Sequence, residues 1–211
     1  MDRFTEAYNR TRQIMETLNS LGFDINDPYS IDSLDLPKEI YYEMGATRLV
    51  VWDNTYDDYV VKIALSDDCE KYCVHEVELY HAAVKAGLEA QFGWCEEIYC
   101  YGERSVYAME FLNCDYEDTD SQAYKWDYNR YCSNNGLDPA EEENLRAYSR
   151  EHWGSVDEDT LIEWFEDKLL KPVAAKFDKF ISDYSISDIH PGNIARRGSE
   201  WVLCDYAGYD W

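Results

Sequence analysis

The sequence predicts an α+β fold, because its strand-like and helix-like segments lie in different parts of the chain. β-branched and aromatic residues are concentrated in residues 43–65 and 94–112, and each stretch is divided by a short polar turn. Apolar residues recur at helical spacing in residues 4–22, 67–86 and 157–184. A group of strands followed by a group of helices is typical of proteins in which an antiparallel sheet and the helices occupy separate regions.

These patterns divide the chain into three regions. Residues 1–42 are expected to form an N-terminal helix, which ends at Gly22, and a turn-rich connector. Residues 43–112 are expected to contain the sheet together with the helix at 67–86. Residues 113–211 are expected to be mainly helical until their last two dozen residues.

The most unusual property of the composition is its acidity. The chain has 44 Asp and Glu residues against 19 Lys and Arg residues, which gives a formal net charge of −25. Such a surface repels nucleic-acid phosphates and anionic membranes, so we expect no direct binding to either. It suits solubility, and it also suits a basic protein partner. An aromatic content of 16 % argues against global disorder.

The sequence also favours a cytoplasmic location. It has no apolar run near the roughly 18 residues that a membrane helix needs, and its N-terminus lacks the apolar core of a signal peptide. Its seven cysteines are scattered and odd in number, which argues against a disulfide framework. We therefore expect reduced thiols.

Lys62 is the first residue that suggests a functional site. It is an isolated cation in the apolar strand-like segment 59–65, and a buried lysine needs an anionic partner. The following helix at 67–86 offers Glu76 and Glu78 as candidate partners. A lysine on the solvent face of the strand remains the alternative. The predicted apolar stripe of this helix consists of Val74, Val77, Tyr80, Ala83 and Val84.

The C-terminal region suggests a second site. Two short apolar segments flank a polar turn at residues 196–200 and predict a hairpin. Asp188, Asn193 and Asp205 would then lie at one end of this hairpin. Carboxylate and amide oxygens are ligands that Mg²⁺ prefers, together with phosphate oxygens and water. The alternative is that these residues only form turns, since Asp, Asn, Pro and Gly are the usual turn residues.

The string Asp188-Ile189-His190-Pro191-Gly192-Asn193, a strand, and then Asp205-Tyr206-Ala207-Gly208 resembles the catalytic and metal-binding loops of the protein-kinase-like superfamily. The resemblance is greatest to its atypical, small-molecule branch, that of the aminoglycoside phosphotransferases, and covers residues 43–208. It implies a minimal bilobal fold. The N-lobe would be a small antiparallel sheet with one helix, and the C-lobe would be reduced and mainly helical.

The resemblance also implies a role for each candidate residue. Asp188 would orient or deprotonate the acceptor hydroxyl, while Asn193 and Asp205 would bind Mg²⁺. Lys62, in a strand similar to the lysine strand of kinases, would hold the α- and β-phosphates of ATP. It would pair with a glutamate of the next helix, and the family pattern favours Glu76 over Glu78.

The same resemblance extends to the nucleotide-binding elements. Gly45 occupies the place of the glycine-rich phosphate loop, although the family has three glycines there and this chain has one. Met109 would hold the gatekeeper-like position. The backbone groups of Glu110 to Leu112 would face the adenine.

Two functions follow from these patterns. The first is an ATP- and Mg²⁺-dependent phosphotransferase of atypical kinase type, whose acceptor is an unidentified small molecule or protein. The alternative is a catalytically weak or inactive pseudokinase-like protein, of phage or mobile-element origin, that uses its acidic surface to bind or inhibit a partner. The single glycine at Gly45 and the charge of −25 favour the alternative, whereas the presence of Lys62, Asp188, Asn193 and Asp205 in family order favours the first.

Overall fold

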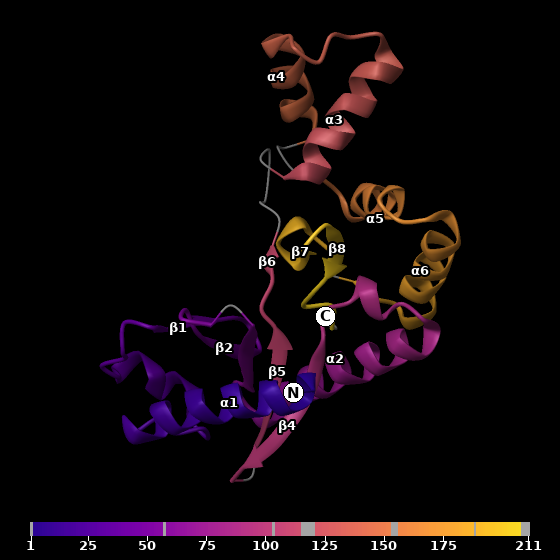
Figure 1. Ribbon diagram of the computed structural model, residues 1–211. Helices are drawn as coiled ribbons and strands as arrows, with labels where there is room; N and C mark the ends of the chain where they lie inside the picture. The colour runs from indigo at the N-terminus through magenta and orange to yellow at the C-terminus, as the bar shows by residue number, and fades with distance from the viewer. Residues whose placement is uncertain are drawn as a thin grey trace. The chain divides into compact units, whose positions relative to one another are not determined.

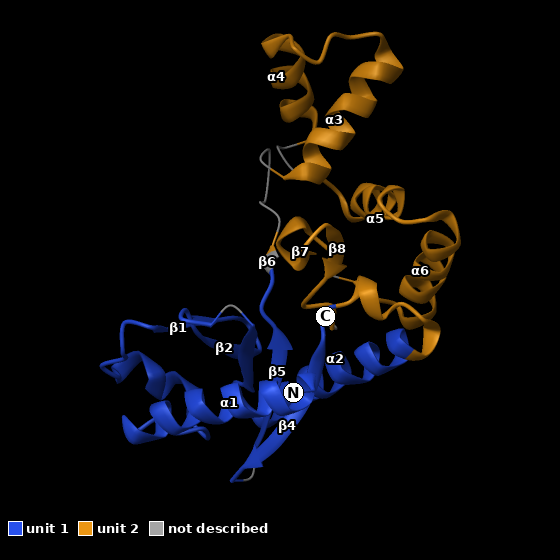
Figure 2. Cartoon of the chain, viewed as in Figure 1, with its two compact units in different colours: residues 1–84, 93–112 blue, residues 85–92, 113–211 orange. Residues whose placement is uncertain are grey.

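The chain forms two compact units in a computed structural model that describes residues 2–56, 58–102, 104–114, 121–152, 156–187 and 189–207. The first unit comprises Met1–Val84 and Gly93–Leu112, and the second comprises Lys85–Phe92 and Asn113–Trp211 (Figure 2). The first unit contains the larger sheet and the second is largely helical. The α+β class expected from the sequence is therefore confirmed.

The sheet of the first unit has five antiparallel strands in the order β1-β2-β3-β5-β4 (Figure 1). Four of these strands lie in the two stretches where the sequence predicts them. The edge strand β1 was missed, because most of its side chains are exposed and show no apolar alternation. The strands are β1 (Ile40–Met44), β2 (Arg48–Asp53), β3 (Tyr59–Ala64), β4 (Cys95–Tyr101) and β5 (Arg104–Glu110).

Helix α1 (Arg3–Ser20) packs on one face of this sheet. The helix begins at Asp2, whose carboxylate accepts a hydrogen bond from the Thr5 N–H at 2.9 Å, and the chain leaves it through Gly22 at φ +94°. Residues 1–42 therefore belong to the same compact unit as the sheet. The core between helix and sheet contains Ile14, Met15, Leu18, Leu49, Val51, Val61, Ile63 and Val106.

Helix α2 (Asp67–Ala86) covers the opposite face, because Cys73 packs against Ala64 and Tyr107 and side chains alternate along each strand. Its bounds match the predicted helix. The predicted apolar stripe is partly wrong, since Val74 and Val84 are 41 % and 40 % exposed. The helix is turned so that a charged side chain, not these two valines, faces the sheet.

The second unit contains four of the described α-helices. Pro172 lies in the first turn of α6 and splits the helical pattern predicted for residues 157–184, as expected for a residue without a backbone N–H. Within the described residues, no helix is both long enough and apolar enough to cross a membrane. The helices are α3 (Gln122–Asn135), α4 (Glu142–Glu151), α5 (Glu158–Asp167) and α6 (Lys171–Tyr184).

A three-stranded sheet of β6 (Asn113–Cys114), β7 (Ile194–Arg197) and β8 (Glu200–Leu203) completes the second unit. The β7–β8 hairpin lies where the sequence predicts it, with Gly198 in its turn at φ +63°. Two short 3₁₀ segments belong to this unit, η2 (Glu89–Gln91) and η4 (Pro191–Asn193). Rings of Phe92, Phe177, Phe180 and Tyr206 pack together next to the hairpin.

Candidate functional site

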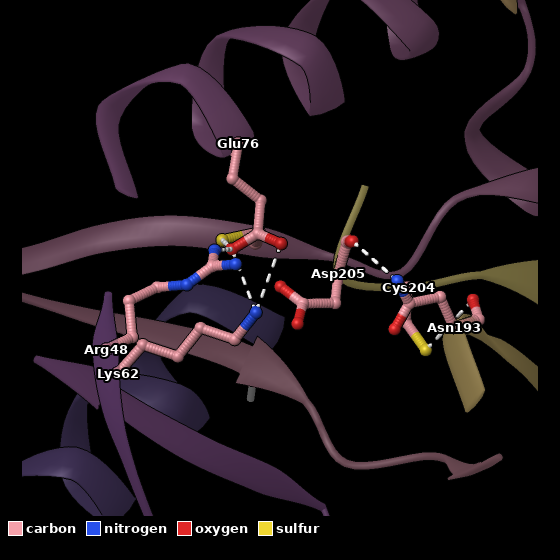
Figure 3. A network of polar contacts seen from close by, with 7 residues as sticks. Arg48, Lys62, Glu76, Asn193, Cys204 and Asp205 are labelled. Carbon is pink, nitrogen blue, oxygen red and sulfur yellow. Dashed lines mark hydrogen bonds and ion pairs between the residues drawn. The ribbon is translucent and has the colours of Figure 1, made fainter. Parts of the chain in front are cut away.

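The first candidate site is a cluster of three charged side chains in the first unit (Figure 3). Lys62 of β3 donates from Nζ to both carboxylate oxygens of Glu76 of α2, at 3.0 and 2.9 Å. Arg48 of β2 donates from Nη1 to Oε2 of the same carboxylate at 2.9 Å. The exposed fractions of these side chains are only 5 %, 0 % and 6 % for Lys62, Glu76 and Arg48. Three elements of the fold therefore meet at one buried carboxylate.

Strand register explains why the two cations project from the same face of the sheet. Lys62 lies directly opposite Val50 in the antiparallel pairing of β2 and β3. Arg48 is two residues before Val50, so its side chain points to the same face. Glu76 lies three residues after Cys73, on the buried face of the helix. Glu78 is exposed, and the structure thus pairs Lys62 with Glu76.

The two cations of the cluster share one carboxylate, that of Glu76. Two buried thiols lie close to it and stay neutral. Burial raises the pKa of Cys73 to about 12, with the charge of Glu76 adding to the effect. Burial, followed by the charge of Glu76, raises the pKa of Cys95 well above its ordinary value. These thiols therefore add no negative charge to the cluster.

The turn between β1 and β2 differs from a phosphate-binding glycine loop. Gly45 is exposed, and its N–H donates to the Arg48 carbonyl at 2.9 Å, which closes a tight hairpin. A Cβ added at Gly45 would lie 3.3 Å from that carbonyl oxygen. The N–H of the one glycine in this turn is therefore engaged within the hairpin and does not point to a ligand.

The predicted adenine-binding segment lies at the end of β5. Met109 is buried in the sheet. The Glu110 N–H donates to the Trp94 carbonyl at 2.9 Å, and the Glu110 carboxylate forms an ion pair with Arg3 at 3.2 Å. Leu112 is partly buried at the end of the first unit. Of the backbone groups expected to face a base, the Glu110 N–H is thus already used within the protein.

The second candidate site lies at one end of the β7–β8 hairpin, in the second unit. The pairing of Ile194 with Leu203 brings Asn193 next to Cys204, whose N–H donates to the Asn193 carbonyl at 2.8 Å. The Asn193 side chain donates from Nδ2 to the backbone carbonyl of Asp205 at 3.3 Å (Figure 3). Asn193 and Asp205 therefore lie together at this end, as the sequence predicts.

A short turn fixes Asn193 in this position. The Asn193 N–H donates to the carbonyl of His190 at 2.8 Å, and the His190 ring accepts at Nδ1 from the Gly192 N–H at 3.2 Å. Pro191 is buried between them. Asp188, the predicted catalytic residue, lies outside the described residues, as does Gly208 of the metal-loop motif.

The donor set of this second site fits Mg²⁺. The amide oxygen of Asn193 and the carboxylate of Asp205 are hard oxygen donors, and Mg²⁺ commonly takes one or two protein ligands together with phosphate oxygens and water. Across the described residues, no group of three or more His, Cys, Asp or Glu side chains could hold a metal ion. An ion here would therefore depend on oxygens from phosphate and solvent.

Arg48 is the site residue that the sequence analysis missed. The sequence does indicate this residue, because Arg48 directly precedes the apolar segment 49–52. It is a cation next to an apolar strand, and Lys62 is a cation within one. A cation in a segment that the sheet buries needs an anionic partner. Arg48 thus needs an anionic partner for the same reason as Lys62 does.

Comparisons of the chain with protein-family models, with curated proteins and with solved structures gave no match. The functional inference therefore depends on the residues and on the geometry of the two sites.

Proposed function

We propose that this protein is an ATP- and Mg²⁺-dependent phosphotransferase of atypical kinase type, with a hydroxyl of a small molecule or of a protein as acceptor. The observation that carries the proposal is the buried pair of Lys62 on β3 and Glu76 on the helix that follows. In protein kinases a lysine of the third strand pairs with a glutamate of the next helix and positions the nucleotide phosphates. The proposal includes a bilobal kinase-like fold.

Each residue has a defined part in this reaction. Lys62, oriented by Glu76, binds phosphate oxygens of the nucleotide and reduces the repulsion between the phosphates and the nucleophile. Asn193 and Asp205 hold Mg²⁺, which supplies positive charge to the phosphates. Asp188 orients the acceptor hydroxyl and takes its proton. Phosphoryl transfer needs mainly positioning and electrostatic stabilisation, so these few groups suffice.

The first test is calorimetric titration of the intact chain with ATP in the presence of Mg²⁺. Lys62→Met and Asp205→Asn should each weaken binding by about tenfold or more, because each removes a charged contact to the phosphates or the metal. Lys179→Met is the matched control, since Lys179 is 71 % exposed on α6 and pairs with Asp183. Absence of binding heat for the unmodified chain would refute nucleotide binding.

The second test concerns the chemistry. Release of phosphate from ATP, or transfer to the protein itself, should depend on Mg²⁺ and should be lost in Asp188→Asn while ATP binding persists. Binding without any turnover in the unmodified chain would reject the catalytic part of the proposal and keep the nucleotide-binding part.

A second candidate function is a pseudokinase-like acidic protein that binds or inhibits a basic partner. Two observations favour it: the Gly45 N–H is engaged with the Arg48 carbonyl, and the chain carries a net charge of −25. Such a protein would bind a lysine- and arginine-rich polypeptide with an affinity that falls steeply as salt is added. Binding of that kind, unchanged in Lys62→Met and accompanied by no ATP binding, would favour this function over the first.

A further inference from the structure

We propose that Cys114 and Cys204 form a reversible disulfide bond when the protein meets a low-molecular-weight disulfide such as oxidised glutathione. All seven cysteines lie within the described residues and are present as thiols. The Sγ atoms of Cys114 and Cys204 are 3.6 Å apart, although 90 residues separate the two cysteines in sequence. This inference goes beyond the proposed function, because it requires neither a nucleotide nor a metal ion.

The three-stranded sheet of the second unit brings the two thiols together. Cys114 of β6 lies directly opposite Ala195 of β7, and Ala195 lies opposite Val202 of β8. Residues that lie opposite one another in a sheet project from the same face, and Cys204 follows Val202 by two residues and so keeps to that face. Only the methyl group of the buried Ala195 projects between them, which leaves room for the two sulfur atoms.

Burial differs between the two thiols and sets the order of reaction. Cys114 is exposed, whereas Cys204 is only 6 % exposed. The Cys204 N–H donates to the Asn193 carbonyl at 2.8 Å, and the Cys204 thiol donates to the same oxygen at 3.4 Å (Figure 3). A tripeptide disulfide therefore reaches Cys114 first. Cys204 is the resolving thiol, in the arrangement typical of redox-sensitive cysteine pairs.

The reaction is thiol–disulfide exchange in two steps. The Cys114 thiolate attacks one sulfur of oxidised glutathione, which breaks the S–S bond of the oxidant and releases one glutathione thiolate. The Cys204 thiolate then attacks Cys114 Sγ and displaces the second glutathione. In total the two protein thiols lose two electrons and two protons, and the two released glutathione molecules take them up.

The strand β6 can supply the movement that bond formation needs. An S–S bond is about 2.05 Å long, so the two sulfur atoms must approach by roughly 1.5 Å. β6 lies at the edge of the sheet and pairs with β7 at two residues, Asn113 and Cys114, so a small shift of this strand breaks few contacts. The disulfide would then anchor β6, the segment with which the chain enters the second unit after Leu112, to the β7–β8 hairpin.

A packing contact is the alternative interpretation of the pair. Cysteine behaves as a small apolar residue, and two thiols can lie in contact without reacting. In that case oxidised glutathione would leave both thiols unchanged, or would remain attached to Cys114 as a mixed disulfide. Formation of the bond between Cys114 and Cys204 therefore separates the two interpretations.

The test treats the full chain with oxidised glutathione, alkylates the remaining thiols under denaturing conditions and maps the disulfides by peptide mass spectrometry. Three variants accompany the unmodified protein: Cys114→Ser, Cys204→Ser and the control Cys100→Ser. Cys100 is the matched control because it is also exposed, while its thiol contacts Glu97 and Ser105. The decisive measurement is made on the unmodified chain, so it does not depend on the folding of any variant.

We expect the unmodified chain and Cys100→Ser each to yield a pair of peptides joined through Cys114 and Cys204, and dithiothreitol to restore both thiols. In Cys204→Ser, glutathione should accumulate on Cys114, because the resolving thiol is absent. In Cys114→Ser, Cys204 should remain a thiol. Glutathione that stays on Cys114 of the unmodified chain, a bond from Cys114 to any other cysteine, or no oxidation of the pair would overturn the proposal.

Hydrogen exchange tests the anchoring of β6. The backbone amides of residues 113–114 and 195–197 should exchange at least about tenfold more slowly in the oxidised protein, since β6 can no longer separate from β7 by local opening. Unchanged exchange in a fully oxidised sample would refute the anchoring and leave the disulfide itself established. None of these results depends on nucleotide binding, so the proposed function stands or falls by its own tests.

Discussion

The Lys62 ammonium donates to both oxygens of the Glu76 carboxylate, at 3.0 and 2.9 Å, across 14 residues of sequence. This contact joins the central strand β3 to the helix α2 on the face opposite α1. Both side chains are almost completely buried, so water could not solvate either charge if its partner were removed. The contact is therefore as important for stability as it is for the proposed function.

Glu76→Gln should destabilise the first unit strongly. The substitution leaves Lys62 and Arg48 as two buried cations without their shared carboxylate, and breaking a buried ion pair by removing one partner costs about 3–5 kcal/mol. Urea unfolding should show the loss. Glu78→Gln is the matched control, because Glu78 is exposed on the same helix and its change should stay within about 0.5 kcal/mol. Equal effects of the two substitutions would contradict the assigned pairing.

Stability should fall as the pH rises above 9. The folded state raises the pKa of Cys73 from 9.0 to about 12, so between these values the unfolded chain loses a proton that the folded chain keeps. The free energy of unfolding then decreases by about 1.4 kcal/mol per pH unit. Below pH 9 this thiol contributes no pH dependence. Urea unfolding from pH 8 to 11 measures the slope, which should be smaller in Cys73→Ala and unchanged in Cys100→Ala, since Cys100 is exposed.

Tyr148→Phe should destabilise the helices α3 and α4. The Tyr148 hydroxyl donates to the side chain of Asp127, and both residues are buried in a cluster of aromatic rings. Removing the hydroxyl takes one hydrogen bond from a buried carboxylate, which costs about 1–3 kcal/mol. The control is Tyr184→Phe, because Tyr184 is 46 % exposed. A loss no greater than in this control, measured by thermal unfolding, would argue against the contribution of the Asp127 contact.

Asp205→Asn and Asp205→Ala should differ in stability although both remove the carboxylate. Asp205 has φ +53°, a left-handed conformation that Asn and Asp tolerate better than Ala does. We expect the alanine variant to be less stable by about 1 kcal/mol, and the asparagine variant to remain close to the unmodified protein. Denaturant unfolding compares the two, and equal stability would show that the backbone conformation of Asp205 imposes no strain. Asparagine is for this reason the better substitution for testing Mg²⁺ binding.

Local sequence patterns predicted several elements correctly. The strands β2 to β5, the bounds of α2, the division of the last helical segment at Pro172 and the β7–β8 hairpin all follow from residues close to one another in the chain. Each depends on alternation, helical spacing or turn chemistry, which act over short distances. The predicted meeting of Asn193 and Asp205 belongs to this group, because a hairpin brings its two ends together.

Helix α3 shows why a local pattern can be overlooked. Its tyrosines at positions 124, 128 and 131 are spaced for one helix face, and Ser121 and Gly136 occupy its N- and C-terminal caps. The sequence analysis did not detect this spacing, because the segment is rich in acidic and aromatic residues. The helix is stabilised by packing of these rings against Tyr148 of α4, a residue that local propensity does not take into account.

From its own residues, the chain specifies where most strands, helices and turns lie, and it marks Lys62 as a cation that needs a partner. The family resemblance favours Glu76 over Glu78 as the partner of Lys62, and the structure pairs Lys62 with Glu76. The exposure of Val74 and Val84 and the participation of Arg48 become visible only when β2, β3 and α2 are assembled. The physical reason is that burial of two cations is tolerable only beside a carboxylate. This requirement acts between residues far apart in sequence. It turns α2 so that Glu76 faces the sheet, and Val74 and Val84 are exposed as a result.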